Sequence, residues 1–87
     1  MSDNTEPLVD KDELRQLIAD AVDVGVEEVG DDTDFVTELE VDSLMALEIV
    51  VRVEKQYGVK MQESELKSVT SLDAVAELLS GKLAARA

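Results

Sequence analysis

The sequence contains no cysteine, no histidine and no tryptophan, and only one proline, one tyrosine and one phenylalanine. Without cysteine there is no disulfide framework, no thiolate metal site and no cysteine nucleophile. Without histidine the chain lacks the usual general base, so a hydrolytic triad has no candidate base. The scarcity of aromatic side chains argues against a surface that stacks nucleic-acid bases. These absences leave few routes to catalysis within the chain itself.

Basic side chains are also scarce, since 21 Asp and Glu residues face 8 Lys and Arg residues, for a net charge of −13. Such a charge repels phosphates, so we expect neither a nucleic-acid partner nor an anionic membrane partner. No apolar run is long enough to span a bilayer, and no signal segment begins at Met1, which predicts a cytoplasmic protein. The length of 87 residues predicts one domain, residues 7–87, after a disordered tail, residues 1–6.

The charge is distributed unevenly along the chain. Residues 1–42 hold 15 acidic residues against two basic ones, whereas residues 43–87 hold six of each. Two interpretations remain open at this point: the acidic residues merely solvate a surface, or they cluster near Ser43 and attract basic partners.

The first predicted helix begins at Pro7 and ends at Gly25, because apolar residues recur in it every three or four positions. Asp10 is its predicted N-cap. Residues 25–42 follow as a long loop with a short turn of helix near Phe35. Loops of this length are usually functional or packed by their own side chains. The loop residues expected to reach the core are Val26, Val29, Phe35, Leu39 and Val41.

The second predicted helix runs from Ser43 to Tyr57 and ends at Gly58. A short helix within residues 63–69 follows, and the last helix opens at Thr70 as N-cap with Asp73 at its third position, then runs to about residues 83–85. No segment alternates clearly enough to be a strand. The predicted fold is therefore all-α, a small four-helix bundle of three main helices and one short helix, with a long loop between the first and second helices.

The second helix carries more apolar surface than one buried face needs. One stripe is Ala46, Ile49, Val50, Val53 and Tyr57, and the other is Leu44, Leu47 and Val51. The second stripe is either exposed or part of a wide core face that the long loop covers.

Tests for catalytic and metal-binding motifs fail. The stretch "DDTDFVTELEVD" does not match a calcium-binding EF-hand loop. Counted from Asp32, Thr37 stands where the loop needs glycine and Ser43 where it needs glutamate, and counted from Asp31 the glycine position is Val36. No carboxylate pair stands out as an acid–base pair, and no glycine-rich phosphate loop is present. Ser43 remains as the candidate site. With Asp42 as cap, the Ser43 hydroxyl lies on the outside of the first helical turn, where an attached anion is stabilised. The alternative is that the Asp-Ser pair only caps the helix.

The order of these motifs resembles that of acyl carrier proteins. Asp42-Ser43-Leu44 follows a long loop and opens an apolar helix that ends in "VEKQYGVKM", and a "TSLDAVAELL" helix follows. The resemblance covers the chain from about Leu8 to Leu83. It implies a free-standing carrier and not an enzyme. Ser43 would be esterified by 4′-phosphopantetheine, donated from coenzyme A by a separate Mg²⁺-dependent transferase, and the thiol of the arm would carry acyl groups as thioesters.

The resemblance also implies roles for other residues. Asp42 would belong to the cofactor site together with Ser43. The partner-binding residues would be Leu44, Met45, Leu47, Glu48, Val51 and Glu54 on the second helix, with Glu40 before it. The residues lining a pocket for the acyl chain would be Ile49, Val53, Tyr57 and Met61. The implied partners are a phosphopantetheinyl transferase, a ketosynthase, an acyltransferase and other synthase enzymes with basic docking surfaces, acting on a monomer.

The chain departs from the family pattern at three places. Glu40 stands where the family commonly has glycine, which bears on the backbone turn before Ser43. Met45 stands at a position that is often acidic, and Arg52 and Lys55 balance the acidic residues of the second helix. We therefore infer that the loop attracts basic partners. The loop residues concerned are Asp31, Asp32, Asp34, Glu38, Glu40 and Asp42.

These departures favour polyketide or another specialised synthesis over fatty-acid synthesis. Asp42 argues against the peptidyl carriers, which usually have histidine before the serine. Two function classes are thus in competition. One is the carrier, and the other is an acidic helical interaction module without a prosthetic group, which would bind a basic protein through Leu44, Leu47 and Val51.

Overall fold

A computed structural model describes residues 9–86, apart from the side chain of Arg86. The predicted tail, residues 1–6, and the predicted helix start at Pro7 lie outside these residues. Within them there is no strand, and no helix is long and apolar enough to cross a membrane. The elements are α1 (Lys11–Val22), the 3₁₀ helix η2 (Val26–Glu28), α2 (Phe35–Leu39), α3 (Ser43–Tyr57), the 3₁₀ helix η3 (Glu63–Ser68) and α4 (Leu72–Arg86). The predicted all-helical class is confirmed.

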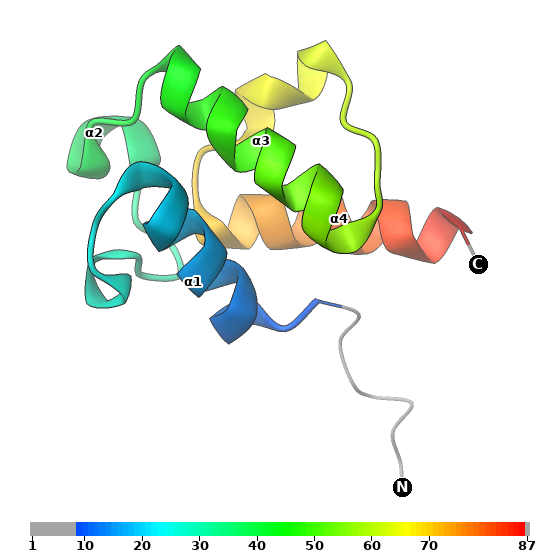
Figure 1. Ribbon diagram of the computed structural model, residues 1–87, viewed down its shortest axis with the longest axis horizontal. Helices are drawn as coiled ribbons and strands as arrows, with labels where there is room; N and C mark the ends of the chain where they lie inside the picture. The colour runs from blue at the N-terminus through cyan, green and yellow to red at the C-terminus, as the bar shows by residue number, and fades with distance from the viewer. Residues whose placement is uncertain (1–8, 87) are drawn as a thin grey trace, which may run out of the picture.

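The three long helices and the long loop enclose one apolar core (Figure 1). Helix α1 packs against both α3 and α4, and η3 contacts α3 and α4. The short helix α2 lies at the same end of the molecule as the start of α3. No polar or charged residue among those described is buried. The largest fully buried side chains are Phe35, Leu14, Ile18, Ile49, Leu72 and Leu79.

Helix α1 begins at Lys11, directly after the predicted N-cap, and ends earlier than the sequence predicts. Val9 and Asp10 are not helical, so the helix predicted from Pro7 onward begins too early. The Asp10 carboxylate accepts hydrogen bonds from the backbone N–H groups of Asp12 (2.9 Å) and Glu13 (3.3 Å), which confirms it as the N-cap. The predicted end at Gly25 is wrong. Asp23 adopts a left-handed conformation with φ 61°, which closes the helix after Val22.

Three of the five loop residues expected in the core are buried, namely Val29, Phe35 and Val41, and Leu39 packs against the core while half-buried. Val26 is 37% exposed, so its predicted place in the core is wrong. It lies in η2, which has no buried residue. The predicted turn of helix after Asp34 is confirmed as α2.

A network of charged groups holds the loop against α1 and α4. The Lys11 ammonium lies 2.6 Å from the Asp73 carboxylate and 3.2 Å from that of Asp31. The Arg15 guanidinium donates to Asp31 Oδ1 (2.8 Å) and to the Val29 carbonyl (2.6 Å). The Asp73 backbone N–H donates to the Asp31 carbonyl at 3.0 Å. Asp31 is thus bonded through both its side chain and its backbone.

The predicted N-cap of α4 is wrong by one residue. The helix begins at Leu72, and the Ser71 hydroxyl accepts a hydrogen bond from the Ala74 N–H at 3.1 Å. The Thr70 carbonyl instead accepts the Phe35 N–H at 2.8 Å, which joins this segment to the long loop. The Asp73 carboxylate pairs with Lys11 and so belongs to the network that holds the loop against α1 and α4.

Glu40 forms the turn between α2 and α3. It has φ 55° and ψ 39°, the left-handed conformation that glycine adopts most easily. The N–H groups of Glu40 and Val41 both donate to the Phe35 carbonyl. The left-handed turn is therefore formed even though glutamate replaces the family's usual glycine.

Replacing Glu40 with glycine should raise the free energy of unfolding by roughly 1 kcal/mol relative to the Glu40→Ala variant, because glycine has no Cβ to strain the left-handed turn. Both variants remove the same charge, so their difference isolates the backbone effect. Urea unfolding measured by circular dichroism provides the comparison. If the alanine variant were as stable as the glycine variant, the turn would store no strain.

Asp31→Asn should destabilise the fold at pH 7, because it removes a charged partner that Arg15 and Lys11 share. The Arg15 guanidinium and the Lys11 ammonium hold the pKa of the Asp31 carboxyl below its ordinary value of 3.8. The stabilisation is thus present above the unfolded-state pKa and is lost as the pH falls through the lower folded-state pKa. The melting temperatures of variant and wild type should therefore converge below pH 4.

Asp32→Asn is the matched control, since Asp32 is exposed in the same loop and forms no ion pair within residues 9–86. It should leave the stability unchanged or raise it by relieving repulsion between acidic residues. A deficit of Asp31→Asn that stayed constant between pH 7 and pH 3 would contradict the role of the Asp31 charge.

Candidate functional site

Ser43 is the first residue of α3, and its position is fixed by the residue before it. The Asp42 carboxylate accepts the Met45 N–H at 2.9 Å, and the Asp42 carbonyl accepts the Ala46 N–H at 2.9 Å. The predicted cap is confirmed. The Ser43 side chain is exposed, so its hydroxyl is accessible at the positive end of the helix dipole. An anion attached at this hydroxyl would be stabilised by that end of the helix.

A groove of about 460 Å³ lies beside Ser43. This volume is in the range of small-molecule sites, about 300–1,000 Å³. The groove is formed by α2, the start of α3, η3 and the segment before α4. Its lining residues are Val36, Val41, Asp42, Ser43, Ala46, Leu66, Lys67, Val69 and Thr70. An accessible hydroxyl next to a largely apolar groove fits a phosphopantetheine arm, which needs an ester oxygen for its phosphate and room for its chain.

The groove contains residues that sequence reasoning missed. Leu66 and Lys67 come from η3 and Val36 from α2, and they meet Ser43 only because the helices fold together. No local pattern in the sequence marks them. The exposure of Val36, at 59%, is the structural sign that this side chain is left uncovered at the surface.

The second apolar stripe of α3 is exposed. Leu44 is 75% exposed, Leu47 46% and Val51 38%, so the long loop does not cover this face. The stripe also lines a shallow hollow of about 310 Å³ that reaches Ala21 on α1. Contiguous exposed apolar side chains mark interaction sites. This settles the alternative left open by the sequence in favour of an exposed face.

The other residues predicted to bind partners differ in their exposure and in their contacts within the chain. Met45 is half-buried against the core, and Glu48 is exposed but paired with Arg52 at 2.8 Å. The Glu54 carboxylate accepts the Met61 N–H at 2.8 Å and so holds the turn that follows α3. Glu40 is exposed. Their role in partner binding stays a prediction.

The residues predicted to line an acyl pocket belong to the packed interior. Ile49 and Val53 are fully buried, and Met61 packs against the core cluster while half-buried. The Tyr57 hydroxyl donates to the Glu13 carboxylate at 3.4 Å. Burial, with a contribution from the nearby Glu13 charge, raises the pKa of Tyr57 to about 12. None of these four side chains lines the groove beside Ser43, and the acyl pocket stays a prediction.

Acidic side chains of the loop fall into two groups. Asp31 is neutralised by Lys11 and Arg15, so it contributes little to an external field. Asp34 caps α2 by accepting the N–H groups of Val36 (2.9 Å) and Thr37 (3.0 Å). Of the six loop residues predicted to attract basic partners, those that are exposed and form no ion pair within the described residues are Asp32, Asp34, Glu38, Glu40 and Asp42.

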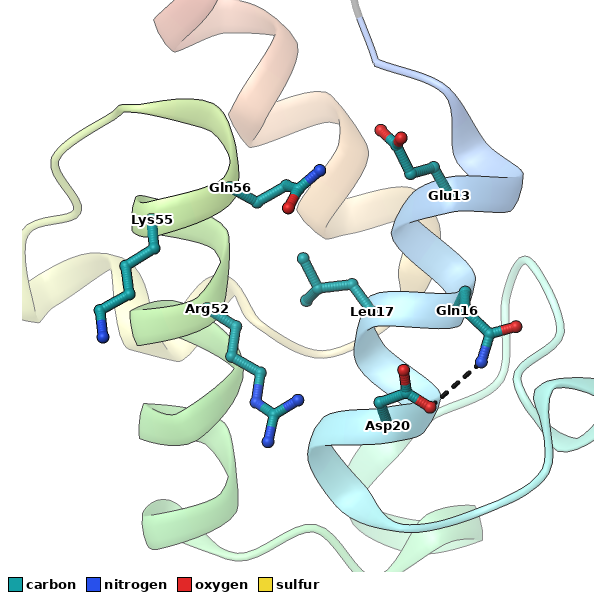
Figure 2. Close-up of a pocket in the computed structure, with 7 residues that line it drawn as sticks. All are labelled: Glu13, Gln16, Leu17, Asp20, Arg52, Lys55 and Gln56. Atoms are coloured by element: carbon teal, nitrogen blue, oxygen red, sulfur yellow. Dashed lines mark hydrogen bonds between the residues drawn. The ribbon is translucent and has the colours of Figure 1, made fainter.

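A second groove, of about 440 Å³, runs between α1 and α3 (Figure 2). Acidic Glu13 and Asp20 lie on the α1 side, and basic Arg52 and Lys55 lie on the α3 side, with Leu17 between them. This groove is distinct from the one beside Ser43, and none of its residues was predicted to form a site.

Comparison with known proteins identifies the family. The model of the phosphopantetheine attachment site matches residues 12–79. The polyketide-8 synthase acyl carrier protein 2 of Streptomyces avermitilis is 55% identical over 83 residues, which are 95% of each chain. The acyl carrier protein of Streptomyces coelicolor is 36% identical over 87% of this chain and 84% of its own, and that of Petrotoga mobilis is 32% identical over 84% and 91%.

Both predictions of a carrier and of its prosthetic group are confirmed by these matches, and the alternative of a module without a prosthetic group is not supported. Proteins of this family are carriers, not catalysts. A phosphopantetheinyl transferase and synthase enzymes act on them. The chain belongs to the acyl carrier protein family, whose members carry acyl intermediates on 4′-phosphopantetheine.

Proposed function

We propose that Ser43 carries the 4′-phosphopantetheine arm and that the protein delivers acyl intermediates to the enzymes of a polyketide synthase. The observation that supports Ser43 as the attachment site is its exposed hydroxyl, which the Asp42 cap fixes at the start of α3 beside a groove. Support for the pathway comes from the name of the Streptomyces avermitilis relative. The arm supplies the thiol that holds an acyl group as a thioester.

Each part of the site has a separate task in this function. Asp42 orders the first turn of α3, so that Ser43 is presented in one position to a transferase. The free N–H groups of that turn favour the negative charge of an attached phosphate. The chain has no histidine or cysteine for acyl transfer, so the partner enzymes supply the reacting groups.

The face of α3 that follows Ser43 is the proposed docking surface. Leu44, Leu47 and Val51 supply exposed apolar area, and exposed Glu40 and Asp42 supply negative charge at the same end of the helix. A partner with an apolar patch bordered by basic residues would match this surface. The predicted ketosynthase and acyltransferase partners, and the monomeric state of the carrier, belong to this proposal.

Incubating the chain with coenzyme A, Mg²⁺ and a phosphopantetheinyl transferase should raise its mass by one arm, roughly 340 Da. Ser43→Ala should abolish the increase, because alanine has no oxygen to form the phosphate ester. Mass spectrometry of the intact protein measures both results. Ser64→Ala is the control, since Ser64 is an exposed serine in η3 and should not be modified.

Circular dichroism should show that both variants keep the helical content of the wild type. An increase of one arm in Ser43→Ala would move the attachment site elsewhere. No increase in the wild type, with a transferase that modifies a known carrier under the same conditions, would contradict the proposed function.

A further inference from the structure

Lys67 is a cation without a partner in the groove beside Ser43. Within residues 9–86, Lys11, Arg15, Arg52 and Lys82 each pair with a carboxylate, whereas Lys67 forms no ion pair. Its side chain is exposed, and it lines the groove from η3. An exposed ammonium group at this place is free to pair with an anion that enters the groove.

The surroundings of Ser43 would otherwise repel an anion. Asp42 lines the same groove, and exposed Glu38 and Glu40 precede it in the chain. The phosphodiester of an attached arm adds one more negative charge to this acidic region. Among the nine lining residues Lys67 is the one that carries a positive charge. Attraction to Lys67 and repulsion from the acidic residues therefore favour the same direction for the arm, across the groove toward η3.

The rest of the groove suits the part of the arm beyond the phosphate. Val36, at 59% exposed, and half-buried Leu66 present apolar surface, and the Thr70 side chain offers a hydroxyl. The pantetheine chain has a dimethyl-substituted carbon near its phosphate and two amides beyond it. Covering Val36 and Leu66 would remove apolar area from water.

We propose that Lys67 binds the phosphodiester of the arm and holds the pantetheine chain in the groove between α2, α3 and η3 when no partner is bound. This proposal rests on the proposed function, since it needs an arm on Ser43. Lys67 is a positioning residue in this arrangement. An exposed ion pair shifts an equilibrium by a factor of about 1.5 to 5. The docked arm is therefore a resting state that a partner enzyme can displace.

NMR of the complete chain tests the proposal without measuring activity. Attachment of the arm is first verified by intact mass, and backbone amide spectra of the apo and holo forms are then compared at low salt. In the wild type, the amides of Val36, Leu66 and Lys67 should shift on attachment, in addition to those next to Ser43. The ³¹P signal of the phosphodiester should relax as part of the folded protein.

Lys67→Gln should take up the arm at the expected mass, but its shifts at Val36 and Leu66 should be smaller than the wild-type values, by a factor of up to about 5, with slower ³¹P transverse relaxation. Lys60→Gln is the matched control, because Lys60 is also exposed and unpaired within the described residues but does not line the groove. It should behave as the wild type, and Lys67→Arg should restore the shifts. Raising the salt concentration to about 1 M should weaken the wild-type effect.

Equal groove shifts in the Lys67→Gln and Lys60→Gln variants, or wild-type shifts confined to the neighbours of Ser43, would overturn the role of Lys67 while leaving the attachment site intact. A chain that gains no arm by mass would refute the proposed function, and this proposal with it. The mass and the NMR spectra thus separate the two failures.

Discussion

The position of Ser43 depends on how the long loop is fixed, and the contacts of Asp31 are what fix it. Lys11 and Arg15 bind its carboxylate, and its carbonyl accepts the N–H of Asp73, so α1, the loop and α4 meet at one residue. A few residues later, the N–H of Phe35 bonds to the Thr70 carbonyl. The segment that leads into α3 is therefore held at two points, and these two contacts determine the position of the start of α3.

The network also explains how so acidic a chain folds around a small core. Lys11 and Arg15 are the two basic residues within residues 1–42, and both pair with carboxylates of this network, next to the densest run of acidic residues. The acidic residues left unpaired lie on the surface, where water screens their repulsion. Charge is thus neutralised where the loop is fixed against α1 and α4, and it remains on exposed residues, among them Glu40 and Asp42 of the proposed docking surface.

Sequence reasoning succeeded where one local segment determines the structure. The Asp10 and Asp42 caps, the end of α3 at Gly58 and the apolar stripes of α3 follow from neighbouring residues alone. It failed where distant segments compete for the same group. The predicted cap at Thr70 was wrong because the Thr70 carbonyl is bonded to Phe35 and Asp73 to Lys11. The groove beside Ser43 could not be predicted for the same reason, since Lys67 and Val36 come from different elements.

The two stripes of α3 have a consequence for how mutations act on this protein. Substitutions at Ile49 or Val53 reduce the population of folded chains, and in a cell they would be seen as reduced abundance. Leu44 and Leu47 are exposed, so substitutions there should leave abundance nearly unchanged, and on the proposed docking surface they would instead slow the engagement of partner enzymes. With the proposed docking surface, one helix would give two kinds of genetic defect at alternating positions. Overexpression would rescue the first kind but only partly the second.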